Sequence, residues 1–442
     1  MRVFKPFLII TMLLIPGALF AQKADTLDIN EAIRLGIENN FSIQIARNNQ
    51  TIASNNNTLG NAGFLPSVTA DASLTNRIQD NRTVFAAGTI PDRDDRGAET
   101  TVINYGIDAN WTIFDGLSMF AVADRLEIES ERSELETQLQ IEAVLSDIIS
   151  GYFQIVGQQQ AYNVLENTLE ISRERIRIAE TKLDLGSGSK YDLLQAQADF
   201  NADQAALIRT GTGLKQAKVL VNQILAIPVD QKLNVQSFIQ LGEPLDLDQV
   251  LSLANEQNLQ LNAARLSEQV AAAEIREITG EWFPQITLGG GYRFNRVEAS
   301  QGFSELNESS GFSYGITARV NLFDGLNKSR RRQNASVELK NEQIRNEEQH
   351  FEINARIVQT FEAYDDALAL IQLEEENLNI NQESLDIALE RYRLGTINSV
   401  ELREAQLSLL NAENRLISAK IEAKLAETEL LRLSGVLVNR LD

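Results

Sequence analysis

The chain reads KLDLGSGSKYDLLQAQ at residues 182–197 and RYRLGTINSVELREAQ at residues 391–406. In both stretches a glycine follows a helix-forming run, and an acidic residue begins the next run, which is the pattern of a turn between two helices. Matching positions lie 209 residues apart, since 401 − 192 and 395 − 186 both equal 209. The matched pairs are Leu185-Gly186 with Leu394-Gly395, Asp192 with Glu401, and Ala196-Gln197 with Ala405-Gln406. The chain therefore contains an internal duplication.

The duplication covers nearly the whole chain. Pro66 matches Pro284 at a spacing of 218 residues (284 − 66), while NYGIDANWTIFDG (104–116) matches SYGITARVNLFDG (313–325) at 209. The change in spacing corresponds to a longer polar loop in the first copy. Each copy reads in the order helix, strand, strand, long helix, turn, helix. We divide the chain into a signal peptide at 1–21, a first repeat at 22–226, a connecting segment at 227–244 and a second repeat at 245–442.

The signal peptide is inferred from the first residues. Arg2 and Lys5 precede an apolar run from Phe7 to Phe20, which is followed by Ala21. A basic start, a short apolar core and a small residue at the cleavage point are typical of a secretory signal. The run is shorter than the roughly 20 residues of a membrane-spanning helix. We therefore expect the protein to be exported.

The composition excludes several classes of function. The chain has 62 acidic and 40 basic residues, no cysteine and one histidine, His350. Removal of two basic residues with the signal peptide changes the net charge from −22 to −24 (−22 − 2). This acidity argues against nucleic acid or an anionic membrane surface as the main partner. Without cysteine, and with one histidine, no disulfide, Ser-His-Asp triad, Cys-His pair or thiolate or imidazole metal cluster can form. We expect no enzymatic activity, no cofactor and no metal centre.

The start of each repeat carries helix and strand signals. Asp28 with Glu31, and Asp246 with Gln249, have the spacing of a capping box at a helix start. Pro66 and Pro284 then end the first helix of each repeat and open a strand, since proline cannot continue a helix but can begin a strand.

Two stretches in each repeat alternate between apolar and polar residues, which predicts strands with one apolar face. Alternation over roughly ten residues is typical of a membrane β-strand whose other face lines a wet lumen. A soluble sandwich with one solvated face is the alternative for this pattern taken alone. The apolar positions are Val68, Ala70, Ala72 and Leu74; Ile103, Tyr105, Ile107, Ala109, Trp111 and Ile113; Ile286, Leu288, Tyr292 and Phe294; and Phe312, Tyr314, Ile316, Ala318, Val320 and Leu322.

Residues 116–185 and 325–394 lack proline and are rich in strong helix formers. Each stretch of roughly 70 residues measures about 100 Å as one continuous helix, several times the diameter of a typical domain. Apolar residues recur at alternating steps of four and three, the heptad pattern of packed helices, and alanines in the last helix allow close approach. Examples are Ile141, Leu145, Ile148, Tyr152 and Ile155; Ile357, Phe361, Tyr364, Leu368 and Ile371; and Leu402, Ala405, Leu409, Ala412 and Leu416.

Four strands cannot close a barrel, and an open sheet edge cannot lie in lipid. The chain must therefore contribute its strands to an oligomer. Two copies give eight strands with a filled interior, and three give twelve with room for a channel. The long helices would continue the cylinder away from the membrane.

The chain resembles the TolC-type outer-membrane efflux proteins along essentially its whole exported length. The resemblance rests on the two repeats, on TIFDG (112–116) and NLFDG (321–325), and above all on Y-R-L-G-x5-E-L-x-x-A-Q (392–406). It implies a mixed α/β membrane protein: a homotrimeric, twelve-stranded barrel in outer-membrane lipid, continued by a periplasmic α-helical barrel of coiled-coil hairpins. The implied function is a passive exit duct of a tripartite efflux or type I secretion system, which a periplasmic adaptor protein and an inner-membrane transporter open at its periplasmic tip.

The resemblance also assigns candidate site residues. The glycine turns at Gly186 and Gly395 form the periplasmic tip, and acids at the start of each return helix line its closed mouth. The acids are Asp192, Glu401 and Glu404, although an acid at a helix start also complements the helix dipole. Tyr392 matches a tyrosine that links neighbouring hairpins in the family, here with Asp192 as the candidate partner. An arginine of the family pattern is replaced by Ile397.

The strand-to-helix junctions are the second candidate region. They contain the repeated FDG motifs, with aromatic residues near the helix-side ends of the strands. Such residues suit an interfacial aromatic girdle, and plain packing would use the same residues. The motif residues are Phe114, Asp115 and Gly116, and Phe323, Asp324 and Gly325.

The rival interpretations are a periplasmic adaptor protein and a trimeric coiled-coil fibre, neither of which is a channel. An adaptor would have one helical hairpin and many soluble-type strands, and a fibre would lack the glycine tip turns. The chain instead has two hairpins, few strands and both glycine turns.

Overall fold

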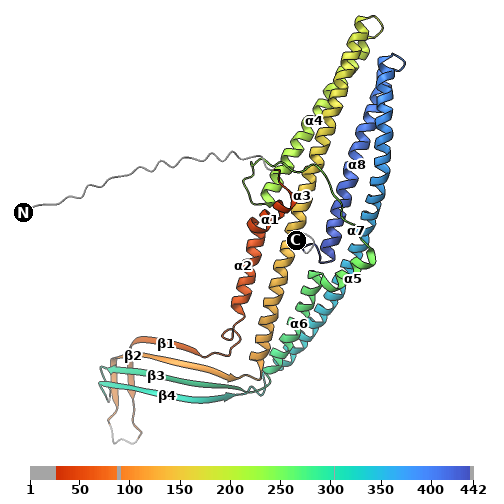
Figure 1. Ribbon diagram of the computed structural model, residues 1–442. Coiled ribbons are helices and arrows are strands. Elements are labelled where there is room, and N and C mark those ends of the chain that lie inside the picture. The colour runs from red at the N-terminus through yellow and green to blue at the C-terminus, as the bar shows by residue number, and fades with distance from the viewer. Residues whose placement is uncertain (1–25, 87–90, 303, 439–442) are drawn as a thin grey trace, which may run out of the picture.

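The computed structural model describes residues 26–86, 91–302 and 304–438. The predicted signal peptide at 1–21 lies outside this range. The described chain is an elongated body with a four-stranded sheet at one end and long helices that rise from it (Figure 1). The elements in order are α1 (Ile29–Asn39), α2 (Phe41–Asn56), β1 (Ser67–Thr83), β2 (Arg93–Phe114), α3 (Ser118–Asp184), α4 (Lys190–Ile224), α5 (Leu247–Gln257), α6 (Leu259–Gly280), β3 (Gln285–Ala299), β4 (Leu306–Arg319), α7 (Asn327–Arg393) and α8 (Ser399–Leu433).

The sheet has the antiparallel order β1-β2-β3-β4, so the two repeats join through β2 and β3. Over residues 67–72 of β1 and the residues paired with them, the register confirms that apolar and polar rows alternate between the two faces. The neighbouring residues Ala70, Ile107, Tyr292 and Phe312 form an apolar row across the four strands. The next row, on the opposite face, is polar or lacks a side chain, and consists of Asp71, Gly106, Arg293 and Gly311. Further along, Leu74 and Ile103 share a row with Arg296 and Glu308. The predicted end of the fourth strand is wrong, since β4 stops at Arg319 and not at Leu322. The strands β1 and β2 also extend well beyond the predicted stretches.

The prolines open strands as predicted, because β1 begins directly after Pro66 and β3 directly after Pro284. They do not end the preceding helices, since α2 already ends at Asn56 and α6 at Gly280. The single helix that was predicted before each proline is wrong. It is divided in two, at Asn40 in the first repeat and at Asn258 in the second, and each asparagine side chain caps the second helix. The predicted capping box is also incomplete, since Asp28 accepts a hydrogen bond from the adjacent Ile29 N–H and not from the N–H of Glu31.

Asn40 and Asn258 also join helices that are distant in sequence. The Asn40 Nδ2 donates to the carbonyl oxygen of Ile224, the last residue of α4, at 2.8 Å. The Asn258 Nδ2 donates to the carbonyl oxygen of Leu433, the last residue of α8, also at 2.8 Å. Each asparagine thus satisfies a free carbonyl at one helix end and free N–H groups at the start of another. As a result α2 continues below α4, and α6 below α8 (Figure 1).

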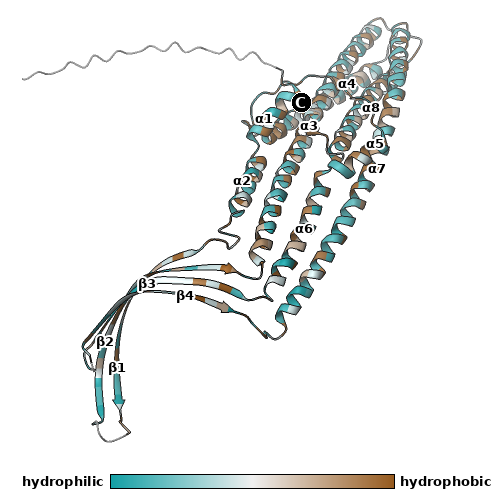
Figure 2. Cartoon of the chain, turned by 60° about the horizontal axis from the view of Figure 1, so that its bottom comes forward, coloured by the Kyte–Doolittle hydropathy of each residue, from teal (hydrophilic) through white to brown (hydrophobic). Residues whose placement is uncertain are grey.

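The long helices have the predicted length. Both α3 and α7 contain 67 residues, and both return helices, α4 and α8, contain 35. Equivalent apolar residues form the two main cores, with Ile148 in the first and Ile357 in the second fully buried. Gly36 permits the close packing of α1 on α3, because a Cβ atom there would lie 2.2 Å from the Ile148 side chain. Many of the other residues of the long helices are hydrophilic (Figure 2). Within the described helices, none is both long and apolar enough to cross a membrane.

One buried acid lies in the middle of α3. Glu142 is 3% exposed and lies near Arg432 and Glu429 of α8. Burial raises the pKa of Glu142 to about 7, with Arg432 opposing and Glu429 reinforcing the shift. Because burial disfavours the charged carboxylate, Glu142 stabilises the fold only while it is protonated.

We expect this acid to make stability depend on pH. The pKa is higher in the folded than in the unfolded chain, so the contribution is complete below the unfolded value and is lost as pH rises through about 7. The wild type should therefore lose about 3 kcal/mol of its free energy of unfolding between pH 4 and pH 8, and Glu142→Gln should abolish this loss. Denaturant titrations in detergent at both pH values would measure it. Glu136→Gln is the control, since Glu136 on the same helix is 58% exposed; an equal effect of both variants would contradict the interpretation.

The two faces of the sheet generate a second prediction, on the expectation that the apolar face contacts lipid. Ile107→Lys or Ile316→Lys would place a charge on this face. Each should destabilise the protein folded in a bilayer by about 2–4 kcal/mol near the midplane. Asn110→Lys and Thr317→Lys lie on the polar face and should be tolerated. Denaturant titrations of refolding into lipid vesicles measure the difference, and equal tolerance at both pairs of positions would show that the assignment of faces is wrong.

Candidate functional site at the helix tips

The turns at the far end of the two hairpins have the predicted glycine caps. Gly186 and Gly395 adopt φ angles of 75° and 76°. In the first turn the N–H of Ser187 donates to the Lys182 carbonyl oxygen at 2.9 Å, and in the second the N–H of Thr396 donates to that of Arg391 at 2.9 Å. This 6→1 bond defines a Schellman motif, which needs a residue in the left-handed conformation and therefore favours glycine.

The acids at the start of the return helices contribute to helix capping. The Ser189 hydroxyl donates to Asp192 at 2.7 Å, and the Asp192 N–H donates to the same hydroxyl at 3.1 Å. Asn398 and Glu401 form a complete capping box at the equivalent position of α8. Glu401 and Glu404 line one groove of about 550 Å³ between α7 and α8. Two of the three predicted gate acids therefore stabilise the tip turns, whatever else they do.

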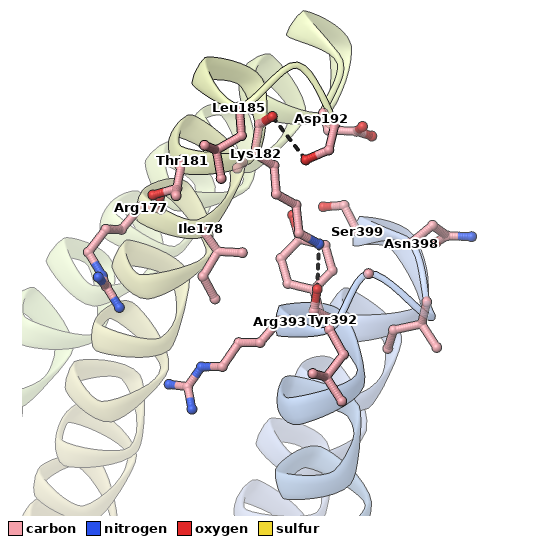
Figure 3. Close-up of a pocket in the computed structure, with 16 residues that line it drawn as sticks. Arg177, Ile178, Thr181, Lys182, Leu185, Asp192, Tyr392, Arg393, Asn398 and Ser399 are labelled. Carbon is pink, nitrogen blue, oxygen red and sulfur yellow. Dashed lines mark hydrogen bonds between the residues drawn. The ribbon is translucent and has the colours of Figure 1, made fainter.

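The tips of the two hairpins meet around Tyr392, which is 3% exposed (Figure 3). The Lys182 ammonium donates to the Tyr392 carbonyl oxygen and lies 4.0 Å from the centre of its ring. Burial raises the pKa of Tyr392, against the effects of its hydrogen bond with Ser399 and of the nearby Arg175 charge. Burial likewise lowers the pKa of Lys182, and Asp192 opposes this shift.

The predicted pairing of Tyr392 with Asp192 does not occur within the described part of a single chain. The Asp192 carboxylate accepts from Ser189 and points away from the Tyr392 ring (Figure 3). Asp192 and Tyr392 nevertheless line the same cavity of about 660 Å³ between the hairpin tips. Tyr392 instead contacts the neighbouring hairpin through Lys182, whereas Ser399 belongs to its own hairpin, at the start of α8.

A buried polar network lies behind the tips and was not predicted. Arg175 on α3 is 1% exposed and donates to Asp199 on α4 at 3.0 Å and to Ser399 on α8 at 3.1 Å. Arg403 on α8 donates to both oxygens of Asp203 on α4, at 2.7 and 2.8 Å. The network therefore ties three helices from both repeats together.

Gln406 is the central amide of this network. Its Nε2 donates to the Ser172 hydroxyl at 2.8 Å and to the Thr168 carbonyl oxygen at 2.9 Å. Its Oε1 accepts from Arg175 at 3.3 Å and from Arg403 at 3.2 Å. The equivalent Gln197 is exposed in the chain. The repeated Ala-Gln pair was visible in the sequence, but its two different environments were not.

The FDG junctions also differ between the repeats. Asp324 caps α7, since its carboxylate accepts from the N–H groups of Asn327 at 3.0 Å and Lys328 at 2.8 Å. Asp115 has a buried oxygen with no hydrogen-bond partner among the described residues. Gly116 is required by packing as well as by its φ of 77°, because a Cβ atom there would lie 2.1 Å from the Gly280 carbonyl oxygen. Phe114 ends β2, whereas Phe323 is 77% exposed on the single chain.

No group of three or more metal-binding side chains occurs in residues 26–86, 91–302 and 304–438. The site is therefore built from helix ends, acids and a cross-hairpin polar network. A sheet with one apolar face and open edges, joined to two helical hairpins about 100 Å long, defines a subunit of an outer-membrane channel with a helical extension.

Comparisons with known proteins support this class. The family model of the outer membrane efflux protein matches residues 32–226 and 250–436. The chain is 20% identical over 430 residues to outer membrane efflux protein BepC of Brucella suis, covering 97% of this chain and 88% of BepC. It is 23% identical over 355 residues to cation efflux system protein CusC of Escherichia coli, covering 76% and 74%. The crystal structure of the Campylobacter jejuni CmeC outer membrane channel superposes with a TM-score of 0.78 at 15% identity, covering 92% and 86%.

The chain belongs to the outer membrane efflux protein family. The predicted fold, with four strands and two helical hairpins in each chain and two internal repeats, is confirmed. The protein is an outer-membrane efflux duct whose helical part lies in the periplasm, and this favours the channel over the adaptor and the fibre.

The buried network generates a stability prediction. Arg175→Leu leaves Asp199 without its buried cation and should lower the free energy of unfolding by about 3 kcal/mol. Arg173→Leu is the matched control on the same helix, since Arg173 is 57% exposed, pairs at the surface with Glu170 and lies 5.8 Å from the centre of the Phe200 ring; its effect should stay within about 1 kcal/mol. Denaturant titrations followed by circular dichroism in detergent compare the two. Equal losses would show that the network does not stabilise the helices.

Proposed function

We propose that the protein is the exit duct of a tripartite efflux or type I secretion system, and that it works as a passive channel opened at its periplasmic tip. One observation carries the proposal. A single sheet with an apolar face continues directly, through the FDG junctions, into two hairpins whose acidic tips lie at the opposite end of the molecule (Figure 1). A solute that crosses the sheet region must therefore also pass the tips.

We propose that the chain assembles as a homotrimer, and the strand edges support assembly into a closed ring. Among the residues that the structure describes, β1 and β4 each lack a partner strand on one side, and unpaired backbone groups are costly in lipid. Pairing of β4 with β1 of the next copy satisfies both edges. Three copies of four strands give twelve, which leaves an open lumen. Outer-membrane lipid would then contact the apolar face.

The tip acids are proposed as the gate. Glu401 and Glu404 lie one helical turn apart on α8, and Asp192 has the position equivalent to Glu401 in the first hairpin. Threefold symmetry would bring these carboxylates close to one axis, where like charges repel and cations are attracted. Tyr392 is proposed to hold the two hairpins of a chain in contact beside this ring of acids.

The helix tips are also the proposed docking site for partners. A periplasmic adaptor protein and an inner-membrane transporter would meet the duct at the turns around Gly186 and Gly395, which lie farthest from the sheet (Figure 1). Their binding would supply the free energy that separates the tips, since a passive channel has no energy source of its own.

Electrical recordings test the proposal. Protein purified in mild detergent should have the mass of a trimer and, in planar bilayers, should conduct weakly and prefer cations. Glu401→Ala combined with Glu404→Ala should weaken the cation preference and any block by multivalent cations added from the periplasmic side. Glu375→Ala, at a surface acid paired with Lys420 away from the tip, is the control. Unchanged selectivity and block in the double variant would mean that the acids are helix caps only.

A further inference from the structure

The polar face of the sheet carries a small group of charges near its middle. The register aligns four polar-face rows across the strands, from the row of Ser67 to the row of Ser73. Among the described residues of these rows, three side chains are charged, and we call them the lumen cluster: Asp71 on β1, Asp108 on β2 and Arg293 on β3. The other positions hold glycine, serine, threonine or asparagine.

Arg293 joins the two carboxylates of the lumen cluster. Its Nε donates to the Asp108 Oδ1 at 3.2 Å and its Nη2 to the Asp108 Oδ2 at 2.5 Å, so this pair is bidentate. The same Nη2 lies 3.9 Å from the Asp71 Oδ1. One guanidinium therefore faces two carboxylates, and the cluster keeps a net charge of −1 in each chain.

Two glycines give these side chains the space to lie along the wall of the sheet. A Cβ atom at Gly106 on β2 would lie 2.9 Å from the Cγ of Arg293 on β3. A Cβ atom at Gly291 on β3 would lie 2.4 Å from the Oδ1 of Asp108 on β2. Each member of the ion pair thus extends over a glycine of the adjacent strand. Glycine at these positions is required by the ion pair itself, because a larger residue would displace it.

The lumen cluster is open to solution. The side chains of Arg293 and Asp71 are 63% and 51% exposed, and that of Asp108 is 21% exposed. The row on one side is neutral, and there the Asn295 amide donates to the Asn104 Oδ1. A solute that moves along the polar face therefore meets these three charges without a competing charge in the adjacent rows.

The lumen cluster lies far from the acids of the helix tips. The sheet and the tips are at opposite ends of the molecule (Figure 1). The long helices between them measure about 100 Å, whereas salt screens a charge within about 8 Å at physiological ionic strength. The cluster therefore acts on a solute independently of Glu401 and Glu404.

We propose that Arg293 determines the charge preference of the barrel lumen, as a second specificity element of the duct. The inference rests on the proposed function, because only a closed ring of chains turns the polar face into a lumen. Rings of acidic side chains favour cations in a pore, and rings of basic side chains favour anions. Arg293 compensates carboxylates that would otherwise form a strongly acidic ring, and so it keeps the lumen passable for anionic solutes.

Ion selectivity tests the proposal. Full-length protein is recorded in planar bilayers across a gradient of dilute potassium chloride, where screening is weak. The reversal potential then gives the permeability ratio of potassium to chloride. Arg293→Gln leaves both carboxylates uncompensated and should raise this ratio about threefold or more. Asp71→Asn combined with Asp108→Asn leaves Arg293 alone and should lower the ratio about threefold or more, because the net charge changes in the opposite direction.

Two further variants separate charge from structure. Arg293→Lys keeps the positive charge without the bidentate geometry, and it should restore the ratio to within about 1.5-fold of the wild type. Arg296→Gln is the matched control on the opposite face of β3, where Arg296 pairs across the strands with Glu308 at 3.0 Å. Since this side chain does not face the lumen, its loss should leave the ratio within about 1.5-fold of the wild type.

Three results would overturn the proposal: ratios for Arg293→Gln and the double aspartate variant that both equal the wild-type ratio, shifts of both in the same direction, or an equal shift in Arg296→Gln. The trimer mass in mild detergent shows which variants assemble. If Arg293→Gln does not assemble, the double aspartate variant compared with Arg293→Lys decides alone. A wild type without conductance steps would overturn the proposed function and this inference with it, whereas unchanged ratios in a conducting protein would overturn this inference only.

Discussion

The unpaired edges of the four-stranded sheet determine much of the remaining architecture. On their outer edges, β1 and β4 each present backbone N–H and C=O groups that have no partner strand in the described part of the chain, and lipid offers none. A closed ring of several chains satisfies these groups. In such a ring, the packing between repeats of neighbouring chains must resemble the packing between the two repeats of one chain. The duplication provides this, since α3 and α7 have equal lengths and so do α4 and α8. A difference in length between the repeats would prevent the helices from meeting in register around the ring.

Equal geometry does not require equal chemistry, and the differences between the repeats lie where the hairpins meet. The same turn, glycine and cap occur twice, because the path of the backbone must be the same. The polar side chains behind the turns occur once. Arg175 and Asp203 have Ser384 and Ala412 as counterparts, so the ion pairs of Arg175 with Asp199 and of Arg403 with Asp203 have no equivalent at the counterpart positions. A buried ion pair is sensitive to the loss of either member and is suited to fixing one arrangement of helices.

The backbone path and the strand faces could be predicted because they depend on local signals. Alternation identified the faces of all four strands, prolines marked where β1 and β3 begin, and glycines marked the tips. Asn40 and Asn258 were missed because an asparagine inside an apolar-periodic run is common, and because the second bond of each, to the carbonyl at a helix end, joins residues more than 170 positions apart in sequence. The Arg175 network was missed for a related reason. A charged residue on a long helix usually faces solvent, and only the packing of α8 against α3 and α4 shows that this one does not. The contact of Tyr392 with Lys182 was missed as well, because it depends on how the two hairpin tips pack against each other.

The asparagine joints have a consequence for the bore of the tube. In space, the end of α4 meets the start of α2, and the end of α8 meets the start of α6. A cross-section of the helical region therefore contains the same number of long helices above and below each joint. Above the joints these are α3, α4, α7 and α8, and below them α2, α3, α6 and α7. The perimeter available to the helices is thus the same along the length of the tube. A wall with a constant number of rods keeps a nearly constant width, so that a solute leaving the tips would travel to the sheet without meeting a narrowing imposed by the helix count.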